Sequence, residues 1–180
     1  QNSFFNPMWD GDRMDSYRRM GRWFSNIVEV PSQNIDRTEV MSALKNGKSY
    51  VSFEIFGMSR GFQFYGERTS TREKIEMSSK TTLGSEKIEL TVKVPAPHAN
   101  SSKRPALLTG RILKATMQGW VKVAESADTK AHELKYLVKE PGVYRAEVRI
   151  KPKHYKKFLP GATNLMHHYP WIYSNPIYVE

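Results

Sequence analysis

Residues Lys87 to Val94 read KIELTVKV, and this stretch decides the fold class because its polar and apolar side chains alternate without a break. A period of two places successive side chains on opposite faces of a β-strand. A shift by one residue would exchange the two faces, so the pattern predicts a single register with one face in a core. The face predicted to be buried carries Ile88, Leu90, Val92 and Val94, and the face predicted to be exposed carries Glu89, Thr91 and Lys93.

Further strands are predicted on both sides of this stretch. Short runs rich in β-branched and aromatic residues are separated by turn residues, and strands at such regular spacing are typical of an antiparallel sandwich. Pro176 interrupts the last run, which suits an edge strand or a bulge because proline cannot donate a backbone hydrogen bond. The predicted strands cover residues 50–56, 62–65, 107–117, 119–125, 132–138, 143–150 and 171–179.

Before residue 49 the pattern is helical. Apolar residues at helical spacing predict a first helix through residues 17–24. Asp36 is a suitable N-cap for a second helix, because Glu39 completes a capping box and Gly47 ends the pattern. We therefore expect a mainly β fold, an antiparallel β-sandwich preceded by a short two-helix segment. The two predicted parts are a helical segment over residues 1–56 and a β-sandwich domain over residues 57–180.

The composition bounds the kind of protein. With 180 residues, of which 39% are hydrophobic, the chain can bury a substantial core. The absence of Cys excludes a disulfide framework, a thiolate zinc site and a Cys nucleophile. A formal net charge of +10 suits an anionic partner, although a basic surface also keeps a protein in solution. No specific nucleic-acid signature accompanies the charge, and no apolar run approaches the ~18 residues of a membrane span.

Sequence motifs that mark catalysis are missing. The five His residues form no H-x-H, H-E-x-x-H or D-x-H pattern, and neither a G-x-S-x-G motif nor a Walker loop occurs. We therefore expect no catalytic residue, no metal ligand and no cofactor in this chain.

Five residues are candidates for ligand binding. Arg145, Glu147 and Arg149 should share one face of a strand, which indicates either a polar face with Arg aimed at an anion or a solvated, ion-paired face. Trp171 and Tyr173 lie in an aromatic segment near the C-terminus. Exposed, these two rings would stack on a sugar or a peptide, whereas buried they would close the sandwich core.

The sequence resembles the C-terminal end of bacterial proteins with a PHP (polymerase and histidinol phosphatase) domain. Residues 141–148, PGVYRAEV, are similar to a strand of the "GVYRVE" kind in those proteins, and residues 170–179 are similar to their terminal "PWIxSNPIY". Residues 15–26 also look like this group, and residues 43–51 resemble the "AL-x-x-G-R-x-Y" that ends the catalytic domain there. The resemblance covers nearly the whole chain.

In that family the catalytic domain is a distorted (β/α)₇ barrel, which holds a metal cluster through H-x-H and D-x-H motifs and hydrolyses phosphoesters. Neither motif occurs in this chain, because Arg13 rather than His follows Asp12 where the second would fall. The resemblance thus implies that residues 1–56 are the tail of an upstream barrel and that residues 57–180 are an appended domain. It also implies that divalent metals belong only to the parent's catalytic domain.

Two functions follow as expectations. The first is a non-catalytic accessory domain of a PHP-like metal-dependent phosphoesterase, with the upstream catalytic domain as its partner. The alternative is a β-sandwich binding module for carbohydrate or an anionic cell-envelope polymer. The sequence leaves the compartment open, with the bacterial cell envelope or periplasm as one alternative.

Overall fold

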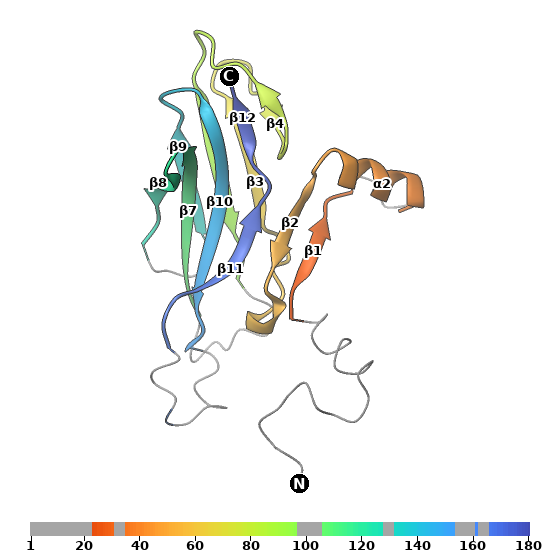
Figure 1. The fold of residues 1–180 in the computed structure, drawn as a ribbon, viewed down its shortest axis with the longest axis vertical. Helices are drawn as coiled ribbons and strands as arrows, with labels where there is room; N and C mark the ends of the chain where they lie inside the picture. The colour runs from red at the N-terminus through yellow and green to blue at the C-terminus, as the bar shows by residue number, and fades with distance from the viewer. Residues whose placement is uncertain (1–22, 31–34, 97–105, 128–131, 154–160, 162–165) are drawn as a thin grey trace.

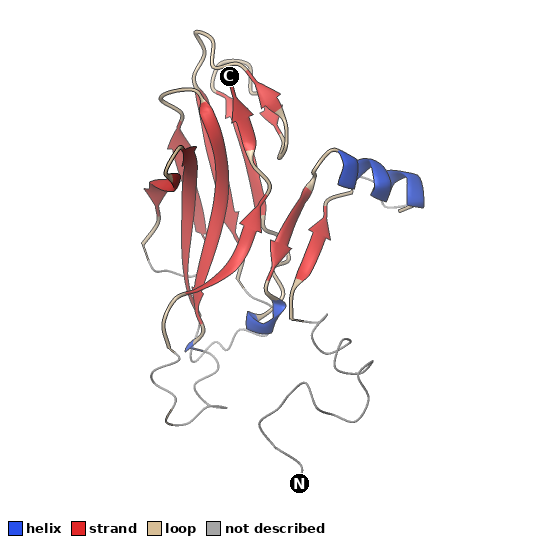
Figure 2. Cartoon of the chain, viewed as in Figure 1, coloured by secondary structure: helices blue, strands red, loops and turns tan. Residues whose placement is uncertain are grey.

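Two β-sheets packed face to face form the body of the protein (Figure 2). The computed structural model describes residues 23–30, 35–96, 106–127, 132–153, 161 and 166–180. The larger sheet has eight strands: β1 (Ser25–Val28), β2 (Ser49–Ser52), β5 (Lys80–Thr81), β7 (Leu107–Thr116), β8 (Gly119–Glu125), β10 (Gly142–Lys151), β11 (Tyr169–Ser174) and β12 (Ile177–Val179). The smaller sheet has four: β3 (Gln63–Arg68), β4 (Lys74–Ile75), β6 (Ile88–Val94) and β9 (His132–Leu137). The predicted mainly β sandwich is confirmed.

Strand β10 is the centre of the larger sheet (Figure 1). One of its edges pairs with β7 from Tyr144 to Lys151. Its other edge pairs with β11 and then with β12, so that the C-terminal segment follows β10 in two pieces. The break between the pieces includes Pro176, as predicted, but the segment is not at an edge, because β2 covers the far side of β11 and β5 that of β12.

Strand β6 carries the pattern that predicted the fold. Its four aliphatic side chains are buried as expected, and Lys93 is exposed. The prediction for Thr91 is wrong, because this residue is only 2% exposed. Its cross-strand partners on the outer side of the sheet are Tyr65 and Lys135, and the short Thr91 side chain lies between these two longer ones. Alternation thus identifies which face points outward but not what neighbouring side chains cover.

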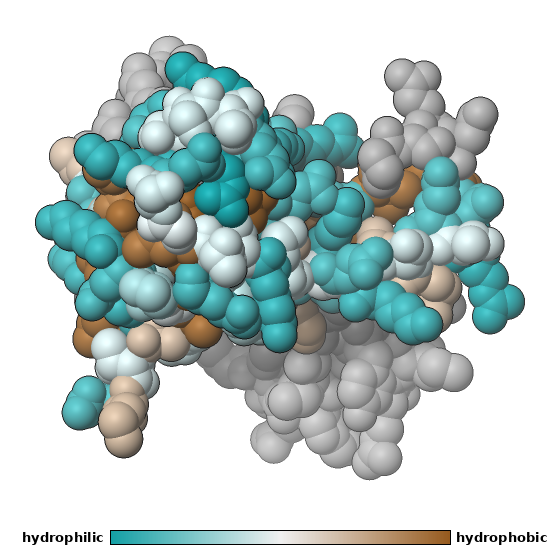
Figure 3. All heavy atoms as spheres, turned by 90° about the horizontal axis from the view of Figure 1, so that it is seen from above, coloured by the Kyte–Doolittle hydropathy of each residue, from teal (hydrophilic) through white to brown (hydrophobic). Residues whose placement is uncertain are grey.

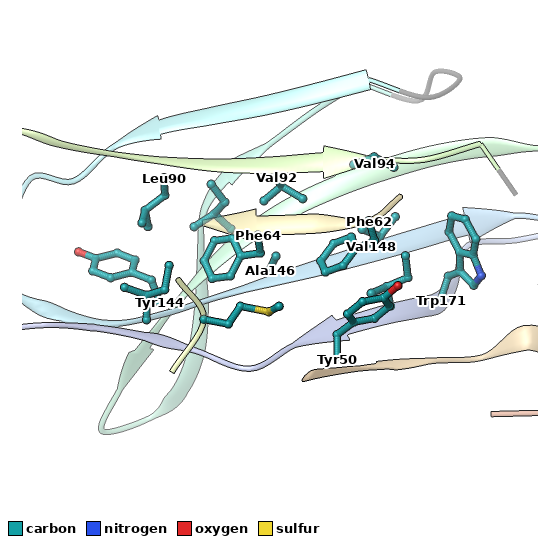
Figure 4. Packing of buried hydrophobic residues seen from close by; sticks show 14 of the residues in the cluster. Tyr50, Phe62, Phe64, Leu90, Val92, Val94, Tyr144, Ala146, Val148 and Trp171 are labelled. Atoms are coloured by element: carbon teal, nitrogen blue, oxygen red, sulfur yellow. The ribbon is translucent and has the colours of Figure 1, made fainter. Parts of the chain in front are cut away.

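The core between the sheets combines aliphatic and aromatic side chains (Figure 4). Tyr144 is fully buried, its hydroxyl donates a hydrogen bond of 2.7 Å to the Glu140 carbonyl, and burial raises its pKa to about 12. Trp171 is also fully buried and donates from Nε1 to the Gly57 carbonyl at 2.9 Å. Both large rings therefore bury their apolar area without leaving a polar atom unpaired, which would cost about 1–3 kcal/mol.

The described residues contain one α-helix, α2 (Arg37–Lys45), so the predicted two-helix segment is confirmed only in its second half. Asp36 caps α2 by accepting a hydrogen bond of 2.7 Å from the Glu39 amide, as the capping box predicted. The first predicted helix falls mostly outside the described residues, and Phe24 at its end directly precedes β1. The predicted strand over residues 50–56 stops at Ser52, and a 3₁₀ turn, η1 (Glu54–Phe56), replaces its second half.

The segment before residue 57 is bound into the same sheet as the C-terminus. Strand β2 pairs with β11, and β1 pairs with β2. The turn after α2 is also fixed, because the Gly47 carbonyl accepts hydrogen bonds from Ser78 Oγ at 3.1 Å and from Asn175 Nδ2 at 2.8 Å. The proposed boundary at residue 56 therefore crosses a continuous sheet, and the division into two domains stays a prediction.

Replacing Leu90 with Ala should lower the free energy of unfolding by about 2–5 kcal/mol, because it removes a fully buried side chain and leaves a cavity. Urea unfolding measures this loss. Lys93→Ala on the exposed face of the same strand is the matched control and should change stability by less than about 0.5 kcal/mol. Equal losses in the two variants would contradict the burial of Leu90.

Replacing Gly47 with Ala should destabilise the fold more than replacing Gly84 with Ala. Both glycines have positive φ, +63° and +53°, so each substitution carries about 1–2 kcal/mol of backbone strain. A Cβ at position 47 would in addition overlap the Ser78 side chain, whereas a Cβ at position 84 meets nothing within 4 Å. Thermal unfolding compares the two, and similar melting temperatures would show that the turn after α2 is not held against Ser78.

Candidate functional site

The outer face of the eight-stranded sheet brings together three of the five candidate residues on one strand. Tyr144, Ala146, Val148 and Ile150 of β10 are buried in the core, so the alternate positions point to the other side. These alternate positions carry Arg145, Glu147 and Arg149. Glu147 and Arg149 form an ion pair on this face, as one of the two alternatives predicted. Arg145 instead contacts two aromatic rings.

Glu147 is the centre of an ion-pair network. Its carboxylate, with 10% of the side chain exposed, lies 3.5 Å from Arg111 Nη1 of β7 and 3.5 Å from Arg149 Nη1. Arg149 also donates from Nη2 to the His168 carbonyl at 2.9 Å. Arg111 extends the network to β8 by pairing through Nε with Glu125. The network thus connects three neighbouring strands of the sheet.

Glu125 closes the network at the edge strand. Lys122 Nζ donates to its carboxylate at 2.7 Å, and this bond, followed by the one from Arg111, holds the pKa of Glu125 below its ordinary value. Glu125 is therefore ionised at neutral pH and acts as a hydrogen-bond acceptor.

A hollow of about 420 Å³ lies beside this network on the surface. It exposes guanidinium, carboxylate, hydroxyl and imidazole side chains, the groups that hydrogen-bond polar ligands. The lining residues, which we call the polar hollow, are Thr109, Arg111, Glu125, Ser126, Ala127, Arg149 and His168.

Arg145 is held between two aromatic rings instead of carboxylates. Its Cζ lies 4.1 Å from the centre of the Trp120 ring and 5.3 Å from the centre of the Tyr173 ring. The rings reach it from opposite sides, since β8 lies beyond β7 and β11 lies on the other edge of β10. Burial, and then the nearby Glu147 charge, raises the pKa of Tyr173. We call these three residues the Trp–Arg–Tyr stack.

Trp171 does not belong to this face, although it is two residues from Tyr173. The register between β10 and β11 shifts, because Val148 pairs with Ile172 whereas Arg149 pairs with Pro170. The extra residue is Trp171, and such a bulge changes which side of the sheet the following residues face. Trp171 therefore enters the core, whereas Tyr173 faces outward. Of the two predicted aromatic candidates, only Tyr173 is on the outer face.

Sequence analysis missed Trp120, Arg111 and Glu125. The signal was available in the hairpin of β7 and β8, where a short turn makes Arg111 a cross-strand partner of Glu125. The contact between Trp120 and Arg145 could not be predicted from one hairpin, because it depends on the order of β8, β7 and β10 in the sheet.

Within the described ranges, no cluster of three or more His, Asp or Glu side chains could hold a metal ion. No helix in the described part of the chain is long and apolar enough to cross a membrane.

Comparisons with protein-family models, with curated proteins and with solved structures gave no match. The resemblance to PHP-domain proteins therefore stays a prediction that rests on the quoted motifs.

Replacing Glu147 with Gln should cost about 1–3 kcal/mol of stability, because a largely buried carboxylate that neutralises two guanidinium groups is removed. Glu133→Gln is the matched control. Glu133 is 41% exposed and 3.6 Å from Lys135, so its pair should be worth less than about 1 kcal/mol. Urea unfolding of both variants tests the difference, and equal effects would mean that Glu147 behaves as a surface charge.

Proposed function

We propose that this chain is a β-sandwich binding module that holds carbohydrate or an anionic cell-envelope polymer on the outer face of its larger sheet. The observation that carries the proposal is the position of the Trp–Arg–Tyr stack on the same face as the polar hollow. Glu147 connects the two features, since it lies two residues from Arg145 and pairs with Arg111 and Arg149 of the hollow.

The chemistry of the two features suits a polyhydroxylated ligand. Sugar hydroxyls both donate and accept hydrogen bonds, and the hollow offers carboxylate acceptors beside guanidinium donors. The Trp120 ring is 40% exposed, and an aromatic ring of this kind offers apolar contact area to a sugar while its neighbours stay hydrated. The stack supplies aromatic contact area and the hollow supplies polar groups, and ligand sites combine the two.

The location on a sheet face favours an extended ligand over a small one. Strands β8, β7, β10 and β11 lie side by side, and they carry the stack and most of the hollow between them. A polymer can contact such a face across several strands, which spreads binding over many modest contacts.

A second function is favoured by a different surface. Around α2 three large apolar side chains are exposed: Ile35, Met41 and Leu44. Apolar patches interrupt the hydrophilic surface over the part of the molecule that carries α2 (Figure 3), and exposed apolar patches mark contact sites. An accessory domain of a PHP-like phosphoesterase would cover this surface with its upstream catalytic domain. The coding sequence upstream of Gln1 tests this alternative, since it requires H-x-H and D-x-H motifs there.

Replacing Trp120 with Ala should weaken polysaccharide binding at least about tenfold if the ring contacts the ligand. Affinity electrophoresis in native gels that contain soluble polysaccharides measures the retardation. Leu137→Ala is the matched control, because Leu137 is also 40% exposed but lies on β9 of the other sheet. Absence of retardation by every polysaccharide would refute the proposed function, and equal loss in both variants would refute the location of the site.

A further inference from the structure

The charges on the outer face do not balance. The ion-pair network and the Trp–Arg–Tyr stack contain four cationic side chains, Arg111, Lys122, Arg145 and Arg149, and two carboxylates, Glu125 and Glu147. Four minus two leaves an excess of two positive charges in this set, and Lys151 adds another on the same face of β10. The ion pairs use Arg111, Lys122 and Arg149, and both carboxylates take part in them.

Of these four cations, Arg145 is the one outside the ion pairs. Among the described residues no ion pair includes it, and its Nε is buried without a hydrogen-bond partner. A buried donor on a charged group that finds no acceptor is costly, so such an atom in a folded protein calls for an explanation. The rings of Trp120 and Tyr173 cover the guanidinium from two sides and hold it in place, and neither of them supplies an acceptor to its Nε.

We infer that Arg145 is the receptor for an acid group of the ligand, and that the ligand is an acidic polysaccharide with carboxylates spaced along a chain of hydroxyl-bearing sugars. This inference rests on the proposed function and names its ligand class. A carboxylate accepts hydrogen bonds from a guanidinium in a planar, paired geometry that a hydroxyl cannot match. The rings that hold Arg145 reduce the side-chain entropy lost when the acid binds.

The carboxylates of Glu125 and Glu147 disfavour a ligand whose negative charges are closely spaced. Glu147 is two residues from Arg145 on the same strand face, which is about 7 Å along the strand. A nucleic acid carries a phosphate at short, regular intervals and would bring negative charge close to Glu147 and Glu125. Sugar hydroxyls instead donate to these carboxylates, so a ligand with one acid group among many hydroxyls satisfies both parts of the face.

The test compares one polymer in two forms. A polygalacturonate with most of its carboxylates methyl-esterified, so that the remaining acid groups are widely spaced, and its carboxyl-reduced, neutral derivative are titrated into the protein at physiological salt by isothermal calorimetry. We expect the acid form to bind at least about tenfold more tightly, because only it offers the charged partner to Arg145. Dextran sulfate is the third ligand and reports attraction to any dense polyanion, which should be weaker than binding of polygalacturonate.

Variants at position 145 test whether Arg145 causes the tighter binding of the acidic polymer. Arg145→Gln should lower the affinity for polygalacturonate to that for the reduced polymer, and Arg145→Lys should restore only part of it, because an ammonium lacks the planar fork. Arg60→Gln removes the same charge from an exposed position elsewhere and should leave both affinities unchanged. The comparison of polymers on the unaltered protein stands even if a variant at position 145 unfolds.

Three outcomes would overturn the inference. Equal binding of the two polygalacturonate forms would show a module for neutral glycans, and the proposed function would survive. Equal weakening by Arg145→Gln and Arg60→Gln, or preference for dextran sulfate, would show unspecific attraction to polyanions. Binding of none of the three polymers would remove the proposed function as well.

Discussion

Strand β10 pairs with β7 on one edge and with β11 and β12 on the other, and the rest of the structure depends on this double pairing. The pairing fixes which β10 side chains face inward, and these meet the four aliphatic side chains of β6 across the core. It also brings the C-terminal segment into the middle of the sheet, where Ile172 and Ile177 are fully buried. Each such burial stabilises the fold by about 1.5–3 kcal/mol, so the last strands hold the sandwich together.

The same pairing builds the outer face. Side chains alternate between the two faces of a strand, so Arg145 and Glu147 point outward because Tyr144, Ala146 and Val148 are buried. Strand order then decides what they meet: β7 and β8 supply Arg111, Glu125 and Trp120 from one side, and β11 supplies Tyr173 from the other. The core and the candidate site are two faces of one strand arrangement.

Much of the fold follows from the sequence because alternation is a local signal. It located β6, β7, β8, β9 and β10 closely, and the capping box located α2. Strands β4 and β5 were missed because two residues cannot show a period. Residues 53–56 looked like strand because three of the four, Phe53, Ile55 and Phe56, are apolar, but the chain turns there. The first part of the molecule joins the larger sheet through a pairing that no local pattern reveals.

The candidate site was predictable only in part, and for the same reason. The periodicity of β10 placed Arg145, Glu147 and Arg149 on one face, but it could not choose between an ion-paired and a ligand-binding face. The choice depends on partners from other strands. The sequence also could not show which β11 side chains face the core. The bulge at Trp171 places Trp171 and Tyr173 on opposite sides of the sheet, although they are two residues apart.

The charged side chains of the outer face contribute less to the stability of the fold than their number suggests. Glu147 is largely buried, so its desolvation offsets much of what it gains from Arg111 and Arg149, and apolar side chains of similar size would often hold such a sheet equally well. Arg145 makes the same point more strongly, since among the described residues its charge has no carboxylate partner and its buried Nε has no acceptor. A leucine at position 145 would still pack between the two rings without either cost. The guanidinium in that position is therefore better explained by the proposed role of receiving an acid group than by a contribution to stability.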